Sequence, residues 1–341
     1  MSVRSAIERA IAGSEVAADV LEAAFGEIME GKVSPVAIAA LLVALRTKGE
    51  TVGEIVAVAR ALRARAVTGP CVDPRTIDTC GTGGDGAGTF NVSTAAAFVV
   101  AGAGVPVAKH GNRAVTGRAG SIDVLEALGV RADLPVEQAV EILASVGIAP
   151  FFARRAHPAL RFVAPVRQEL GVRTLMNCLG PLLNPVGVRR QLVGVYSSAL
   201  VVPMAESLGA LGSERALVVH GEDGLDEITT TAPTRAALFD RARVTPLSID
   251  AQALGLARAR PEELAGGDAR ENATIVRAVL DGEPGPRRDL VLVNAAAALW
   301  VAEAASDLAG GLALARESID SGAARARLAS LVRATAEAPA A

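Results

Sequence analysis

The sequence has few aromatic residues and little excess of charge of either sign. Of its 341 residues, 3% are aromatic although 51% are apolar, so the core must be built mainly from Ala, Val and Leu. Small side chains of this kind suit helices that pack closely on a parallel sheet. The apolar content excludes a globally disordered chain. The formal net charge of -3 lacks the basic excess that is typical of a nucleic-acid-binding protein.

Cysteine is scarce, and so are long apolar runs. Cys71, Cys80 and Cys178 are the only cysteines, and an odd number without C-x-x-C spacing excludes a disulfide framework and a zinc site. The longest apolar stretches, 93–108 and 290–305, fall short of the roughly 18 residues that a transmembrane helix needs. The start of the chain lacks a basic region followed by an apolar one. We therefore expect a soluble, reduced, cytoplasmic protein without a membrane segment.

Two kinds of pattern divide the chain. Up to about residue 66, apolar residues recur at helical spacing, and Ser34-Pro35 and the pair Thr51 and Glu54 provide helix starts, so we expect four short helices. After a turn-rich connector at 68–74, short β-like runs alternate with helical ones, which indicates a mostly parallel sheet flanked by helices. The expected strands cover 77–80, 105–108, 148–152, 191–196 and 216–220, and the expected helices cover 93–103, 121–128, 135–146, 159–170 and 200–211. The tail, about 268–336, again indicates helices.

The segment 170–188 interrupts this alternation. It holds Gly171, Gly180, Pro181 and Pro185 in short order, so it cannot be one regular element. We expect it to be a long crossing connection.

A glycine-rich loop carries the sharpest functional signal. Residues 81–89 (Gly-Thr-Gly-Gly-Asp-Gly-Ala-Gly-Thr) follow an expected strand and lead into the helix that starts at Ser93. Glycines allow backbone N–H groups to turn toward an anion. The helix adds its positive N-terminal end, with Ser93 and Thr94 as hydroxyl donors. The loop therefore predicts a phosphate-binding cradle.

Two nucleotide-binding motifs fit this loop poorly. Gly81, Gly83 and Gly86 match G-x-G-x-x-G, but 95–122 contains no Asp or Glu, and a dinucleotide fold would need an acid there for the ribose. A Walker loop needs Lys after its last glycine, and Ala87 follows Gly86. A flexible glycine turn without a ligand remains the plain alternative, although the strand–loop–helix order is more regular than that alternative requires.

Two further groups can meet the glycine loop at one edge of the sheet. The run 109–113 (Lys-His-Gly-Asn-Arg) follows the next expected strand, and the carboxyl ends of parallel strands open on the same crevice. Lys109 and Arg113 bring positive charge suited to a diphosphate. Asp226 and Glu227 follow a later strand. Such a pair is most often solvated, yet Mg²⁺ is commonly held by one or two carboxylates together with substrate phosphates.

The histidines offer no evident catalytic pair. His110, His157 and His220 are the three in the chain, and no nucleophile–base dyad accompanies them. We expect His220, at a strand end, to be packed in the core. For His157, which begins a helix with Pro158, a capping or packing role is at least as plausible as catalysis.

These motifs, in this order and spacing, resemble the anthranilate phosphoribosyltransferase family over nearly the whole chain. The residues that carry the resemblance are 81–85, 91–94, 109–113, 120–123, 157–158, 165–174, 177–185 and 226–227. The resemblance implies transfer of the phosphoribosyl group of phosphoribosyl diphosphate (PRPP) to the anthranilate amine. The products are N-(5-phosphoribosyl)anthranilate and pyrophosphate, in tryptophan biosynthesis.

The resemblance also implies an architecture. A small helical domain, 1–68, would be joined by hinges to a larger α/β domain, 75–341, with 170–188 as the strand that crosses back. The family usually forms a homodimer through the helical domain. Small-molecule substrates, and neither nucleic acid nor a membrane, are the expected partners.

Individual site residues follow from the resemblance as well. It implies PRPP binding by Gly81, Gly84, Asp85, Thr89, Asn91, Val92, Ser93, Thr94, Lys109, His110, Gly111, Asn112, Arg113, Thr116, Gly117 and Ser121. It implies anthranilate binding by Gly81, Asn112 and Arg167, and two Mg²⁺ ions per subunit at Ser93, Asp226 and Glu227. No discrete catalytic acid or base is expected, because the attacking amine is neutral at pH 7 and the main need is stabilisation of the departing charge.

The chain departs from the family pattern in one loop. Thr116-Gly117 stands where the family usually has Ser-Ser, and Ala119 where Ser is common, so we expect weaker side-chain contacts to the 5′-phosphate. A Thr-Gly-Gly stretch near this place belongs to the related pyrimidine nucleoside phosphorylases, which are the chief alternative. That family lacks the Asp-Glu pair, so Asp226 and Glu227 argue against it. A non-enzymatic relative that binds nucleic acid is a third hypothesis, which the net charge disfavours.

Overall fold

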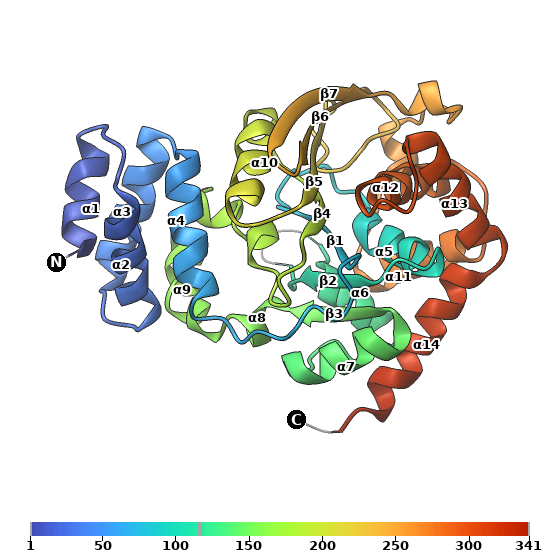
Figure 1. Cartoon of the computed structure of the whole chain (residues 1–341), viewed down its shortest axis with the longest axis horizontal. Coiled ribbons are helices and arrows are strands. Elements are labelled where there is room, and N and C mark those ends of the chain that lie inside the picture. The colour runs from blue at the N-terminus through green and yellow to red at the C-terminus, as the bar shows by residue number, and fades with distance from the viewer. Residues whose placement is uncertain (1, 115–117, 340–341) are drawn as a thin grey trace.

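Helices at the start of the chain form a bundle at one end of the molecule. The computed structural model describes residues 2–114 and 118–339. The bundle consists of α1 (Ser2–Ile11), α2 (Ala18–Met29), α3 (Pro35–Lys48) and α4 (Val52–Arg63) (Figure 1). The expected helix starts are confirmed, because the Ser34 hydroxyl accepts a hydrogen bond from the Ala37 N–H at 3.3 Å and Thr51 and Glu54 form a reciprocal capping box. These contacts satisfy N–H groups that the first helical turn leaves without partners.

The described residues beyond the bundle are organised around a seven-stranded sheet. In spatial order its strands are β3 (Ile148–Phe152), β2 (Val107–Gly111), β1 (Ile77–Gly81), β4 (Arg190–Gly194), β5 (Arg215–Gly221), β6 (Thr234–Asp240) and β7 (Arg243–Ile249). The first five in this order are parallel, and β6 and β7 continue the sheet antiparallel. The expected mostly parallel sheet is therefore confirmed, and the carboxyl ends of β1, β2, β4 and β5 meet at one edge.

The hairpin of β6 and β7 has no counterpart among the expected strands. β7 lies at the edge of the sheet, most of its side chains are at least partly exposed, and Pro246 lies within it. An exposed edge strand gives no apolar run, and proline inside a strand is found mainly at such edges. The sequence pattern therefore carried little signal for β7, whereas β6 is mostly buried and has an apolar run at 236–239 that the expected strands did not include.

The segment 170–188 is not one regular element, as its glycines and prolines predict, but the strand that the resemblance implies there is wrong. The segment contains two short 3₁₀ helices, η2 (Leu175–Asn177) and η3 (Gly180–Leu183). Pro181 and Pro185 have no N–H to donate to a sheet ladder. The segment is fixed instead by Asn184, whose Nδ2 donates to Asp78 Oδ2 and to the Ala108 carbonyl, each at 2.9 Å.

The helix expected over 159–170 is also shorter than the pattern suggests. A 3₁₀ helix, η1 (Pro158–Phe162), comes first, and the α-helix α9 (Ala164–Leu170) begins only after it. Pro165 explains the break, because proline is tolerated in the first turn of a helix but not in its interior.

Helices cover both faces of the sheet (Figure 1). One face packs on α5 (Val92–Gly102), α11 (Ala269–Leu280), α12 (Pro286–Val301), α13 (Leu308–Asp320) and α14 (Ala323–Glu337), and the other on α10 (Val201–Ala210). The remaining helices are α6 (Ser121–Ala127), α7 (Val136–Val146), α8 (Ala153–Ala156), η4 (Ser198–Leu200), η5 (Ala251–Leu254) and η6 (Pro261–Leu264). No helix in the described part of the chain has both the length and the apolar character to cross a membrane.

Alternate residues of the central strands divide the core in two. On β5, Leu217 and Val219 belong to the cluster with α5 and α12, whereas Ala216 and Val218 belong to the other cluster, because successive strand residues point to opposite faces. That second cluster continues without a break into α10, α9 and the N-terminal bundle. The bundle is thus packed onto one face of the sheet.

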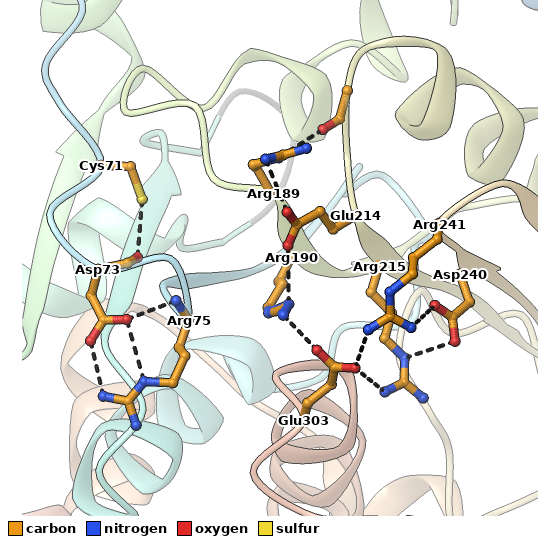
Figure 2. Close-up of polar contacts among 11 residues, drawn as sticks. Cys71, Asp73, Arg75, Arg189, Arg190, Glu214, Arg215, Asp240, Arg241 and Glu303 are labelled. Carbon is orange, nitrogen blue, oxygen red and sulfur yellow. Dashed lines mark hydrogen bonds and ion pairs between the residues drawn. The ribbon is translucent and has the colours of Figure 1, made fainter.

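An ion-pair network closes the amino ends of β4 and β5 (Figure 2). Glu303, which follows α12, contacts Arg190 at 2.5 Å, Arg241 at 2.8 Å and Arg215 at 3.8 Å. Arg190 also reaches Glu214 at 3.5 Å. This edge is opposite to the carboxyl ends of the parallel strands, so the network supports the sheet and not the site described next.

Candidate active site

The glycine loop opens directly from the carboxyl end of β1. Gly83 and Gly84 have φ of +66° and +75°, a backbone conformation that side-chain-bearing residues rarely adopt. The Gly83 N–H donates to Asp226 Oδ2 at 2.8 Å, and the Gly84 carbonyl accepts a hydrogen bond from Arg173. The loop is therefore held by two side chains from distant parts of the chain while its glycines remain exposed.

Glu227 takes the place of a helix cap at the start of α5. The Ser93 N–H donates to Glu227 Oε1 at 3.0 Å. Asn91, in the N-cap position, makes no side-chain cap. Because Asp226 accepts from the Gly83 N–H and Glu227 accepts from the Ser93 N–H, both carboxylates lie at the end of α5 that favours an anion, and these two N–H groups are already paired.

Lys109 lies in the interior, next to the first turn of α5. Its side chain is buried, and its Nζ donates to the Thr79 carbonyl at 2.6 Å and to Ser93 Oγ at 3.2 Å. Burial lowers the pKa of Lys109, and the nearby charges of Asp78 and Glu227 oppose that shift. Lys109 thus orients the Ser93 hydroxyl and places a positive charge under the cradle.

The carboxylates of the site are crowded and poorly solvated. Burial raises the pKa of Glu227 to about 7. Burial, together with the charges of Asp85 and Glu227, raises the pKa of Asp226 well above its usual range. A cation at this place would relieve both penalties.

The donor set fits Mg²⁺ only with help from a ligand. Within the described part of the chain, no group of three or more His, Cys, Asp or Glu side chains is arranged to hold a metal ion. Two carboxylates with a neighbouring hydroxyl, here Asp226, Glu227 and Ser93, match a hard cation that shares its coordination with substrate phosphates and water.

Two glycines, at the ends of β1 and β4, allow Asp226 to approach the backbone of these strands closely. A Cβ on Gly81 would lie 2.5 Å from Asp226 Oδ2, and a Cβ on Gly194, at the end of β4, would overlap the Asp226 carbonyl oxygen. Gly81 was expected in the site from the loop motif. Gly194 was missed, because a single glycine at a strand end carries no distinguishing signal.

The run 109–113 divides its contacts between the site and the interior. His110 is buried, its N–H donates to Asp78 Oδ1 at 3.2 Å, and its Nδ1 lies 3.2 Å from the Gly180 carbonyl. Burial and the neighbouring His157 lower the pKa of His110 to about 3, so the ring is neutral at pH 7. His157 itself is buried with its Nε2 2.7 Å from the Leu183 carbonyl, which agrees with a packing role.

The outer part of this run faces α6. Arg113 donates to Glu126 at 2.7 Å, and its guanidinium lies 5.4 Å from the centre of the Phe152 ring. Asn112 Oδ1 accepts from the Arg113 N–H at 2.9 Å, and the Ser121 hydroxyl lies 3.5 Å from the Asn112 carbonyl. The structure thus brings Asn112, Gly111 and Ser121 together, with Arg113 already paired. Thr116 and Gly117, expected at the same site, lie outside the described residues.

Arg167 stands apart as a cation without a partner. It lies on α9, half-buried, and burial lowers the pKa of its guanidinium. Among the residues that the structure describes, no carboxylate, carbonyl or aromatic ring pairs with that guanidinium. A half-buried arginine of this kind is suited to a planar carboxylate, which it can bind with two parallel hydrogen bonds.

Two residues outside the expected site complete it. Arg173 holds the Gly84 carbonyl and lies 4.6 Å from the centre of the Tyr196 ring. Asn272, on α11, donates to Asn91 Oδ1 at 2.9 Å.

His220, expected in the core, is only half-buried, and its Nδ1 lies 2.7 Å from the Val195 carbonyl.

Comparison with known proteins supports this architecture. Residues 73–325 match the α/β domain of a glycosyl transferase family, and residues 4–66 match the helical bundle domain of a glycosyl transferase family. An anthranilate phosphoribosyltransferase of Rubrobacter xylanophilus is 54% identical over 334 residues, which is 97% of each chain. One of Moorella thermoacetica is 51% identical, also over 97% of each chain.

Solved structures lead to the same family. Anthranilate phosphoribosyltransferase of Thermus thermophilus matches with a TM-score of 0.92 and 44% identity, over 97% of this chain and 99% of that one. The Saccharomyces cerevisiae enzyme, in complex with PRPP and Mg, matches with a TM-score of 0.90 and 27% identity over 98% of each chain. The chain belongs to the anthranilate phosphoribosyltransferase family of glycosyl transferases.

Proposed function

We propose that this chain transfers the phosphoribosyl group of PRPP to the amine of anthranilate, forming N-(5-phosphoribosyl)anthranilate and pyrophosphate in tryptophan biosynthesis. One observation carries the proposal. Asp226 and Glu227 accept hydrogen bonds from the Gly83 and Ser93 N–H groups, so the carboxylates and the anion-binding backbone form a single site. A diphosphate with its cation would need both at the same place.

The residues of the chain divide the chemistry between them. In this proposal the glycine loop, the first turn of α5 and the run 109–113 hold PRPP, with Gly81, Gly84, Asp85, Thr89, Asn91, Val92, Ser93, Thr94, Lys109, His110, Gly111, Asn112, Arg113, Thr116, Gly117 and Ser121 as its binding residues. Arg167 binds the anthranilate carboxylate, with Gly81 and Asn112 beside it. The amine is neutral at pH 7, so orientation and stabilisation of developing charge suffice without a discrete base.

Two Mg²⁺ ions per subunit, bound by Ser93, Asp226 and Glu227, belong to the proposal. When bound, the ions neutralise the diphosphate as it leaves. The protein contributes the N–H donors of the cradle, and the buried Lys109 holds the Ser93 hydroxyl in place.

The assembly belongs to the proposal as well. We infer a helical domain, 1–68, an α/β domain, 75–341, with 170–188 crossing between them, and a homodimer formed through the helical domain. The exposed apolar residues Ile11, Val36 and Val43 lie on α1 and α3, and their side chains are suited to a subunit contact. Light scattering on the intact chain and on Val36→Asp tests this, because a dimer that uses this face should dissociate.

A cytoplasmic location completes the proposal. The three cysteines are free, and Cys71 is exposed, as suits a reducing compartment. Fractionation of cells that produce the protein would test it.

One assay tests the activity directly. Anthranilate is fluorescent, and its signal should fall when PRPP and Mg²⁺ are added to the protein. The loss should require both additions. An unchanged signal with all three components would overturn the proposal. Phosphate-dependent cleavage of a pyrimidine nucleoside, without loss of anthranilate, would point to the nucleoside phosphorylase alternative.

A further inference from the structure

Asn91 occupies a cap position but does not cap its helix. Asparagine at an N-cap usually accepts a hydrogen bond from the first turn. Here the Asn91 side chain is turned away: its Oδ1 accepts from Asn272 Nδ2 at 2.9 Å, and its Nδ2 donates to the Ala119 carbonyl at 3.3 Å. The oxygen of the amide thus faces α11, and its NH₂ group faces the loop between β2 and α6.

The orientation of Asn272 is fixed by the backbone. Asn272 is 2% exposed, and its Oδ1 accepts from the Gly267 N–H at 2.7 Å. A backbone N–H can only donate, so the atom that faces Gly267 must be the oxygen. The Asn272 NH₂ group must then face Asn91, and Asn91 must present its oxygen in return. The Gly267 N–H therefore fixes the Asn272 amide, and Asn272 acts together with the Ala119 carbonyl, which can only accept, to fix the Asn91 amide.

The segments that carry these residues are bound tightly together. The Gly266 N–H donates to the Gly88 carbonyl at 2.9 Å, and Thr89 forms an isolated β-bridge with Ala265. A Cβ on Gly266 would lie 2.6 Å from the backbone of Phe90. The spacing between the glycine loop and the start of α11 therefore leaves little room for either amide to move.

The orientation of the Asn91 amide decides which of its atoms faces the phosphate site. An amide NH₂ group has two hydrogens, and the Ala119 carbonyl takes one from Asn91, so the other remains for an anion. If the Asn91 amide were reversed, its oxygen would face that anion, and the partial negative charge of the oxygen would repel the anion.

We propose that Asn272 is a positioning residue for the phosphate site: it fixes the Asn91 amide with its NH₂ group toward PRPP. The inference rests on the proposed function. It names a residue 181 positions from Asn91 that neither touches the substrate nor belongs to the motifs of the site.

Asn272→Asp tests the orientation with little change of shape. An aspartate accepts from the Gly267 N–H and turns its second carboxylate oxygen toward Asn91, so the Asn91 amide should reverse to donate to that carboxylate, at the cost of its hydrogen bond to the Ala119 carbonyl. The KM for PRPP should rise about tenfold or more, the size expected for loss of a hydrogen bond to a charged group. The KM for anthranilate should stay within about twofold.

A double-mutant cycle separates orientation from the added charge. In an Asn91→Ala background, Asn272→Asp should change the KM for PRPP by less than about twofold, because no amide remains to be turned. Simple repulsion by the new carboxylate would persist in that background and would overturn the proposal. Asp268→Ala is the matched control: it removes the N-cap of the same helix, whose Asp268 accepts from Arg270 and Glu271. It should lower the Tm and leave the KM for PRPP unchanged.

The outcomes distinguish the two levels of inference. Calorimetry with PRPP and Mg²⁺ on the wild-type protein comes first. If the wild type binds PRPP and Asn272→Asp binds it equally well, the positioning role is overturned and the proposed function stands. If the wild type does not bind PRPP, the proposed function fails, and the role of Asn272 fails with it.

Discussion

Glu227 accepts a hydrogen bond from the N–H of Ser93 at 3.0 Å, across 134 positions of sequence. A carboxylate from the loop after β5 thereby occupies the N-terminus of α5, where the helix is most favourable to negative charge. The same end of α5 is where an anionic substrate would bind. Glu227 is therefore both an anchor of the cradle and a candidate ligand for a cation that enters with the substrate.

Loss of either carboxylate should reduce turnover sharply. Asp226→Ala or Glu227→Ala removes a candidate Mg²⁺ ligand, and a diphosphate without a neutralising cation is a poor leaving group. The fluorescence assay, run over a series of Mg²⁺ concentrations, checks this. Full activity of both variants in the presence of a chelator would contradict the metal assignment.

Glu227→Gln should become more stable relative to the wild type as the pH rises. The pKa of Glu227 is about 7 in the folded protein, against an ordinary value of 4.5, because burial disfavours its charged form. The folded protein therefore keeps a proton that the unfolded chain releases. The free energy of unfolding of the wild type is therefore unaffected by Glu227 below pH 4.5, where the residue is protonated in both states. It falls as the pH rises from 4.5 through 7, because only the unfolded chain releases the proton easily. Gln keeps the accepting oxygen and never ionises.

The measurement is denaturant unfolding of both proteins without metal at several pH values. The free energy of unfolding of the variant minus that of the wild type should increase by at most about 3 kcal/mol from pH 5 to pH 8. A difference that stays constant over this range would mean that Glu227 titrates normally.

Gly194→Ala should impair the site without a change in any polar group. The added Cβ would overlap the Asp226 carbonyl oxygen, so the 226–227 backbone must move. We expect the apparent affinity for Mg²⁺ with PRPP to fall about tenfold or more, as for loss of a charge-assisted contact. Gly180→Ala is the control, since no atom lies within 4 Å of a Cβ there. Equal activity of the two variants would show that the 226–227 loop adapts freely.

Arg167→Ala should raise the KM for anthranilate about ten- to a hundredfold, because a charge-assisted pair contributes about 1.5–3 kcal/mol. The KM for PRPP should change little. Arg167→Lys should recover part of the loss, since it keeps the charge but not the planar fork. Arg161→Ala, an exposed arginine beside Phe162, should leave both constants unchanged. If PRPP binding fails instead and anthranilate binding survives, Arg167 belongs to the phosphate site.

Glu303→Gln should destabilise the protein and spare its activity (Figure 2). The change leaves Arg190 and Arg215, whose side chains are each 12% exposed, without their shared carboxylate. Removing one partner of such half-buried pairs should cost about 1–3 kcal/mol of unfolding free energy. Glu222→Gln breaks an exposed pair with Arg235 and should cost less than about 1 kcal/mol. Unfolding curves and the fluorescence assay together check both statements.

Much of the fold could be predicted from the sequence, because local patterns dictate it. The bundle helices were predictable from apolar spacing and from caps such as Ser34 and Thr51, and 148–152 is a strand over the range expected. The glycine loop was predictable for a similar reason: only glycine readily adopts the positive φ seen at Gly83 and Gly84. The edge strand β7 was not predictable in this way, since exposure and Pro246 remove the usual strand pattern.

The assembly of the site depended on tertiary structure. The sequence identified the carboxylate pair and the glycine loop as separate motifs, and the shared family pattern connected them. The contact between Glu227 and Ser93, the close approach that Gly194 allows and the turned amides of Asn91 and Asn272 join residues far apart in the chain. No local preference encodes such contacts. They arise because the carboxyl ends of β1, β2, β4 and β5 meet at one edge of the sheet, and only the packed sheet and α11 bring those side chains within hydrogen-bonding distance.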